Sequence, residues 1–187
     1  DTQQMAVVTD VTKVVDRVMP SVVSIFGTYM TTEDFWGYQF SQEDEGSGSG
    51  FIVGENEEEL LIVTNNHVVA DTTSLSVQFV DEETCYAQVK GTDADSDLAV
   101  IAVKLADLKD STKKAIRIAT LGNSDNLKVG EPAIAIGNAL GYGQSVTTGV
   151  ISAVNRQDSV NENGESLFLI QTDAAINPGN SGGALVN

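Results

Sequence analysis

The chain has 187 residues, of which 41% are hydrophobic and 20% charged, a composition typical of a folded globular protein and not of a disordered one. Its 10 basic and 27 acidic residues give a formal charge of −17, which argues against a partner bound through phosphates, nucleic acid included. The one cysteine, Cys85, cannot form an internal disulfide, which fits a cytosolic protein and equally a bacterial envelope protein held together by packing alone.

The first predicted element is a short amphipathic helix over residues 9–19. Valines recur at helical spacing from Val7 to Val18, and Pro20 ends the pattern. The preceding segment, DTQQMAVVTD, lacks the basic and apolar regions of a signal peptide.

After the helix, the sequence consists of short runs rich in β-branched residues, separated by Gly, Asn, Asp and Ser. The runs are SVVSIFGTYM, FIVG, LLIVT, LSVQFV, CYAQVKG, LAVIAV, AIAIG, VTTGVISAV, LFLIQT and ALV. Many short strands with almost no helical pattern between them predict an all-β sandwich or a pair of barrels. None of the runs approaches the roughly 18 apolar residues of a membrane helix, so no transmembrane segment is predicted.

Residues 31–50 interrupt this pattern, because they are polar, acidic and rich in glycine. We expect them to form a long exposed loop. The stretch also contains the aromatic residues Phe35, Trp36, Tyr38 and Phe40. Such residues are expected to cover the loop's own protein, with a subunit contact as the alternative.

Three residues have the chemistry of a serine hydrolase. His67 is the only histidine, and a histidine with its ordinary pKa of about 6.5 can accept and return a proton near neutral pH. Asp97 directly precedes an apolar run, and Ser181 lies in GNSGG, whose glycines would let a substrate approach the hydroxyl. Taken singly, His67 also fits a structural histidine, Asp97 a solvated carboxylate, and GNSGG a tight turn. Together they provide a nucleophile, the imidazole that accepts its proton, and a buried carboxylate that orients the imidazole.

Backbone amides beside the serine would complete this machinery. We predict that the N–H groups of Gly179 and Ser181, with Asn180 shaping the loop between them, form an oxyanion hole. GNSGG also matches the G-x-S-x-G elbow of α/β-hydrolases, in which the acid and the histidine follow the serine along the chain. Here only GGALVN follows, and the order histidine, aspartate, serine is that of chymotrypsin.

Other motifs fail on particular positions. The D-x-D-x-D spacing at 93–97 opens like a calcium loop, but Leu98 replaces the required glycine and Lys104 the bidentate glutamate. Phe51 occupies the last glycine position of a nucleotide-binding motif that would begin in GSGSG. Cys85 lies in an alternating run typical of a half-buried strand. The sequence predicts no metal and no cofactor.

Three segments, TNNHVV around His67, DSDLAV around Asp97 and DAAINPGNSGGAL around Ser181, closely resemble the catalytic blocks of the HtrA (Deg) family of trypsin-like serine proteases. GSGSGFIV and AIAIGNALG resemble that family as well, and the resemblance runs from about Val11 to the end. It implies a chymotrypsin-like fold of two β-barrels with the active site between them.

The resemblance also implies a domain layout. Residues 1–187 are expected to form one trypsin-like protease domain, with the helix and first barrel over about 9–118 and the second barrel over about 119–187. In similar proteins further strands follow GNSGGAL, so we expect the second barrel to be incomplete at its C-terminal end and this chain to hold no PDZ domain.

The function implied by the resemblance is ATP-independent cleavage of unfolded or misfolded proteins in quality control and the stress response. It also implies homotrimers and an extracytoplasmic location in a bacterial envelope or periplasm, either free or anchored through a segment outside this chain. The alternative is a chaperone-like module of the same fold that binds unfolded polypeptide without cutting it.

Overall fold

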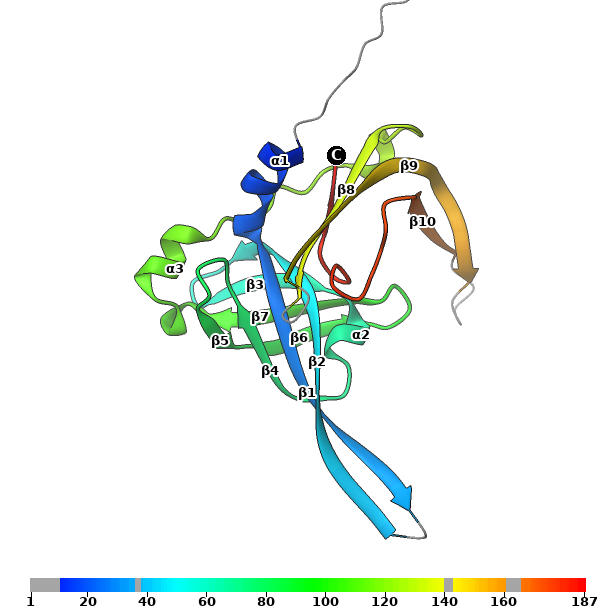
Figure 1. Ribbon diagram of the computed structural model, residues 1–187. Helices are drawn as coiled ribbons and strands as arrows, with labels where there is room; N and C mark the ends of the chain where they lie inside the picture. The colour runs from blue at the N-terminus through cyan, green and yellow to red at the C-terminus, as the bar shows by residue number, and fades with distance from the viewer. Residues whose placement is uncertain (1–10, 36–37, 140–142, 161–165) are drawn as a thin grey trace, which may run out of the picture.

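The structure is a computed structural model, and it describes residues 11–35, 38–139, 143–160 and 166–187. Within these ranges, side chains are not described at 33–35, 38–40, 139, 143 and 158–160. The described strands form two separate antiparallel sheets, which lie in the lower and upper parts of Figure 1. This arrangement of curled sheets with one short helix before them confirms the all-β prediction.

The first sheet has the strand order β5-β4-β1-β2-β3-β7-β6. Its strands are β1 (Val22–Phe35), β2 (Tyr38–Glu55), β3 (Glu59–Thr64), β4 (Thr72–Gln78), β5 (Thr84–Tyr86), β6 (Gln88–Asp93) and β7 (Leu98–Lys104). Side chains alternate between solvent and core along β3, so that Leu60, Ile62 and Thr64 are buried. Leu60 and Ile62 join a continuous apolar core that includes Ile25 and Ile101.

The second sheet has the order β10-β9-β8-β11, with β8 (Pro132–Ala139), β9 (Gly143–Val160), β10 (Ser166–Thr172) and β11 (Ala184–Val186). Its core centres on Ile134 and Ile136 of β8. Helix α1 (Val11–Val18) and the following 3-10 turn η1 (Met19–Ser21) pack their apolar side chains against that core. The predicted helix is therefore confirmed, and its valines face the second sheet.

Short helical segments complete the described structure. They are α2 (Asn66–Val69), η2 (Leu105–Asp107), α3 (Asp110–Ala115) and η3 (Ser124–Asn126). The sequence did not predict them, because segments of three to six residues are too short to display a helical repeat. None of the helices in the described ranges has the length and apolar composition that a bilayer crossing requires.

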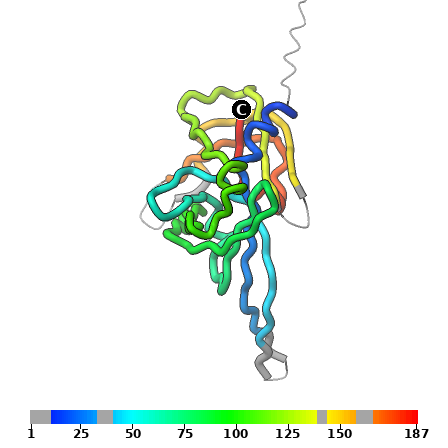
Figure 2. Tube along the Cα trace, turned by 90° about the vertical axis from the view of Figure 1, so that its left-hand side faces the viewer, coloured from blue at the N-terminus to red at the C-terminus, as the bar shows by residue number. Residues whose placement is uncertain are grey.

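The prediction of a loop over residues 31–50 is wrong. Strands β1 and β2 pair in continuous register from Val22 opposite Phe51 to Phe35 opposite Tyr38. Much of this hairpin extends away from the rest of the fold in both views (Figures 1 and 2). Exposed strands of this kind show no alternation of polar and apolar residues, because neither face packs on a core. The side chains of Phe35, Trp36, Tyr38 and Phe40 lie outside the described residues, so their role stays a prediction.

Candidate active site

The register of the first sheet brings His67 and Asp97 together. Strands β3 and β7 are antiparallel neighbours, with Thr64 opposite Ala99. His67 follows the end of β3 on α2, and Asp97 directly precedes β7. Because the end of one antiparallel strand lies beside the start of the next, residues 30 positions apart meet at one edge of the sheet.

The Asp97 carboxylate contacts His67 through both of its oxygens. Nδ1 of the imidazole lies 2.7 Å from Oδ2, and the backbone N–H of His67 donates to Oδ1 at 2.9 Å. The Asp97 carbonyl accepts two further hydrogen bonds, from the Asn65 side-chain amide at 2.8 Å and from the Asn66 N–H at 3.1 Å. The carboxylate and imidazole are therefore held at fixed positions relative to each other.

Asp97 has a left-handed backbone conformation, with φ of 51°. Aspartate tolerates this conformation better than most residues, and it turns the carboxylate back toward α2 as the chain enters β7. The side chains of His67 and Asp97 are 59% and 45% exposed. The expectation of a buried carboxylate is thus wrong, because Asp97 lies in an outer turn of the first sheet.

Ser181 reaches the site from the other sheet, on the segment between β10 and β11. The N–H of Ser49, on β2 in the first sheet, donates to the Ser181 carbonyl at 2.9 Å. The Ser181 hydroxyl donates to the Asn177 carbonyl at 3.4 Å. Among the described residues no hydrogen bond joins this hydroxyl to His67, so the structure contains the His67–Asp97 contact of the predicted triad but not a Ser181–His67 hydrogen bond.

The loop before Ser181 has its own set of hydrogen bonds. The Asn180 N–H donates to the Asn177 carbonyl at 3.0 Å, and the Asn180 side chain binds the Asn177 N–H at 2.9 Å and the Ala175 carbonyl at 3.0 Å. Within the described part of the chain, the N–H groups of Gly179 and Ser181 donate no hydrogen bond. The two amides predicted to bind an oxyanion are thus without an acceptor, while Asn180 shapes the loop.

Strand β9 holds the start of the same segment. The Val150 N–H donates to the Asp173 carboxylate at 2.7 Å, and the Thr147 hydroxyl donates to the Ala175 carbonyl at 2.8 Å. An extra methyl group at Gly149 would lie 2.2 Å from that carboxylate. Strand β9 of the second sheet therefore holds the chain segment that leads to Ser181 by direct contact.

Residues that the sequence did not identify also contact the site. Ser49 is fully buried, and its hydroxyl donates to the Gly179 carbonyl at 3.0 Å. The Asn65 side-chain amide donates to the Asp97 carbonyl, and the Asn138 N–H donates to the Ser49 hydroxyl. The only sequence signal was their position inside the segments TNNHVV, GSGSGFIV and AIAIGNALG, which carry the HtrA resemblance but indicate no individual role.

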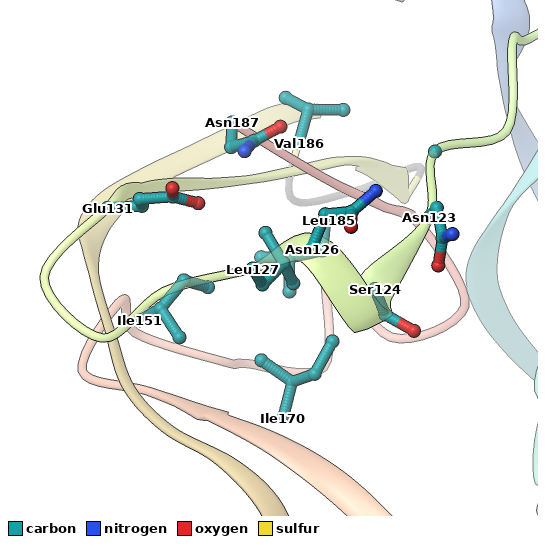
Figure 3. A pocket seen from close by; sticks show the side chains of 11 residues that line it. Asn123, Ser124, Asn126, Leu127, Glu131, Ile151, Ile170, Leu185, Val186 and Asn187 are labelled. Atoms are coloured by element: carbon teal, nitrogen blue, oxygen red, sulfur yellow. The ribbon is translucent and has the colours of Figure 1, made fainter.

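The described pockets lie away from these residues. One, of about 420 Å³, is lined by side chains from β9, β10, β11 and the segment before β8, Ile151, Ile170 and Leu185 among them (Figure 3). Another, of about 790 Å³, lies between α1, residues 117–122 and β11. Neither is lined by a triad residue, so neither supplies acid–base chemistry. In the described residues, no cluster of metal-binding side chains is present.

Comparisons with known proteins identify the family of this chain. A family model described as "Trypsin-like peptidase domain" matches residues 48–187. The chain is 39% identical over 200 residues to "Serine protease Do-like HtrA" of Lactococcus lactis subsp. cremoris, covering 96% of this chain and 46% of that protein. It is 46% identical over 146 residues to "Probable periplasmic serine endoprotease DegP-like" of Pseudomonas fulva, covering 78% of this chain and 28% of that protein.

Solved structures show the same relationship. A variant of the HtrA-type protease AlgW with a decapeptide matches with a TM-score of 0.78 at 36% identity, over 96% of this chain and 55% of that one. AlgW with a tripeptide matches with a TM-score of 0.72 at 39% identity, over 96% and 51%. The chain spans about half the length, or less, of the relatives it matches.

Proposed function

Because the chain belongs to the HtrA group of trypsin-like serine proteases, we propose that it is a serine endopeptidase in which Ser181, His67 and Asp97 form the catalytic triad. The observation that carries the proposal is the double contact of Asp97 with His67, at 2.7 Å to Nδ1 and 2.9 Å to the backbone N–H. A carboxylate on Nδ1 keeps the proton on that nitrogen and leaves Nε2 free to act as a base.

In the proposed reaction, the Ser181 oxygen attacks the carbonyl carbon of a peptide bond while His67 Nε2 accepts the hydroxyl proton. Asp97 stabilises the resulting imidazolium, and the N–H groups of Gly179 and Ser181 bind the negatively charged oxygen. Collapse of the intermediate breaks the C–N bond, and His67 returns its proton to the leaving amine. Water then hydrolyses the acyl-enzyme by the same steps, with His67 again as the base.

We propose unfolded or misfolded polypeptides as the substrates, cleaved without ATP. The support is the family membership, together with solved HtrA-type relatives whose structures contain a tripeptide or a decapeptide. We also propose an extracytoplasmic location, since the Pseudomonas fulva and Hahella chejuensis relatives are named periplasmic endoproteases. The homotrimer implied by the resemblance stays a prediction.

A fluorophosphonate probe tests the proposal, because it forms a covalent adduct only with an activated serine. We expect the adduct at Ser181, located by peptide mapping, and we expect Ser181→Ala to abolish both labelling and casein cleavage. Ser47→Ala is the matched control, since Ser47 lies exposed on β2 and should leave labelling unchanged. A folded protein that binds denatured casein but neither cleaves it nor reacts with the probe would instead be the chaperone-like module.

A further inference from the structure

Ser49 contacts the nucleophile loop through both its backbone and its side chain. Its N–H donates to the Ser181 carbonyl at 2.9 Å, and its hydroxyl donates to the Gly179 carbonyl at 3.0 Å. These bonds connect β2 of the first sheet to a segment about 130 residues further along the chain. Ser49 is 0% exposed, so water does not compete for either contact.

The two carbonyls belong to alternate peptide groups of the loop. The Gly179 carbonyl shares a planar peptide with the N–H of Asn180, and the two point in opposite directions. Ser49 binds the carbonyl side of this peptide, and the Asn177 carbonyl accepts from its N–H side at 3.0 Å. The Gly179–Asn180 peptide is therefore fixed from both ends.

The amides predicted to bind the oxyanion belong to the peptides on either side of that fixed one. The Gly179 N–H belongs to the preceding peptide, and the Ser181 N–H to the following peptide. If the central peptide rotated, both flanking dihedral angles would change, and the orientation of the two N–H groups relative to each other would change with them. The Ser49 hydroxyl is thus one of the two contacts, with the Asn177 carbonyl, that hold the peptide between the two donors.

The surroundings leave the Ser49 hydroxyl little freedom. It accepts a hydrogen bond from the Asn138 N–H at 2.7 Å, and the Asn138 carbonyl accepts one from Ser24. The Ser49 carbonyl accepts from the Thr64 hydroxyl at 2.7 Å. A Cβ atom at Gly137 would lie 2.8 Å from the Ser49 oxygen and 2.4 Å from the Gly179 carbonyl oxygen. With Asn138 as its donor, the Ser49 proton is directed to Gly179.

We propose that Ser49 is a positioning residue whose hydroxyl holds the Gly179–Asn180 peptide, so that the amides of Gly179 and Ser181 converge on the oxyanion of the tetrahedral intermediate. The inference rests on the proposed protease function. It adds a residue whose hydroxyl acts through the loop amides on transition-state stabilisation, and not on substrate binding.

The test compares Ser49→Ala with Ser47→Ala in the purified protein, using a peptide substrate and a peptide trifluoromethyl ketone. Ser47 is the same residue type two positions away on β2, but it is exposed. Losing an oxyanion donor outright costs about 10²–10³ in kcat, and a donor that is only released from alignment should cost about 10–10². We expect Ser49→Ala to lower kcat by that factor with KM nearly unchanged. The affinity for the ketone should fall by a similar factor, because the oxygen of its serine adduct lies in the oxyanion hole.

A purely structural role gives a different result, namely fewer active sites by probe titration with a normal kcat per active site. That result, or kinetics identical to those of Ser47→Ala, would overturn the inference. If Ser49→Ala does not fold, Ser49→Cys supplies the same test, because a thiol occupies similar space but is a weak hydrogen-bond donor. Failure of the proposed function is distinguishable, because the unmodified protein would then neither react with the probe nor cleave the peptide.

Discussion

Replacing Asp97 by asparagine is the sharpest test of the His67–Asp97 pair, because the structure determines how the new side chain must lie. The His67 N–H donates to Oδ1 at 2.9 Å, so the carbonyl oxygen of the introduced amide must stay at that position. The amide nitrogen then takes the place of Oδ2, which lies 2.7 Å from His67 Nδ1. Since an NH₂ group can only donate, Nδ1 must become the acceptor.

The imidazole would consequently carry its proton on Nε2, where the serine proton has to be received. This is the wrong tautomer for a general base, and the same substitution in a trypsin-type triad costs on the order of 10⁴ in kcat. At about 1.36 kcal/mol per tenfold change, the activation barrier should rise by about 5.4 kcal/mol. Folding stability should change far less, by under about 1 kcal/mol, because the two side chains are 59% and 45% exposed and an exposed ion pair contributes little.

The assay is kcat on a peptide substrate together with urea unfolding of the same preparations. Asp95→Asn is the matched control, because Asp95 is exposed in the same turn and its side chain makes no hydrogen bond within the described residues. A kcat within tenfold of the unmodified protein for Asp97→Asn would refute the tautomer argument. So would a loss of activity that follows a loss of folded protein, or an equal loss in Asp95→Asn.

Two further predictions concern buried positions. Gly137→Ala should destabilise the protein by about 1–3 kcal/mol in urea unfolding and lower probe labelling of Ser181, because the new Cβ would lie 2.4 Å from the Asn180 Cα. Gly54→Ala is the control, because its Cβ would meet nothing within 4 Å and should have neither effect; equal effects at both positions would contradict the packing explanation. Burial, assisted by the negative charge of Glu83, raises the pKa of the Cys85 thiol, so the thiol stays protonated at neutral pH and should react with Ellman's reagent only slowly until denaturant exposes it; rapid reaction of the native protein would be the contrary result.

The elements that the sequence predicted correctly are those in which one face packs on a core. The apolar run LLIVT and the valine spacing of α1 both come from residues that pack on a core, as at Ile62 on β3 and Val18 on α1. The hairpin of β1 and β2 was not predicted because much of it extends away from the rest of the fold (Figure 1), and strands that do not pack on a core lack hydrophobic alternation. Its strands are stabilised by hydrogen bonds between their backbones, and backbone pairing does not require any pattern of hydrophobic side chains.

The candidate site also contains features that the sequence predicts and features that it does not. The sequence predicts His67, Asp97 and Ser181, because each has a side chain with a chemical role and the three occur in the order of a known triad. The left-handed backbone of Asp97 and the burial of Ser49 depend on how distant strands pack, and neither has a local signature. A serine among glycines is typical of a turn, yet Ser49 lies within strand β2. A Cβ atom at Gly48 would meet Val68, and one at Gly50 would meet Ile25 and Ile62, so both glycines make room for core side chains.

The His67–Asp97 pair is held by contacts within one sheet, whereas Ser181 is held by contacts between the two sheets. This difference determines which part of the site should be lost first when the fold is disturbed. His67 and Asp97 lie on adjacent strands of one sheet, so their contact forms whenever β3 and β7 pair. Ser181 depends on hydrogen bonds between the sheets, of which those to Ser49 are the most direct. Changes that separate the sheets should therefore remove the nucleophile and its oxyanion donors first, while the imidazole and its carboxylate stay in place.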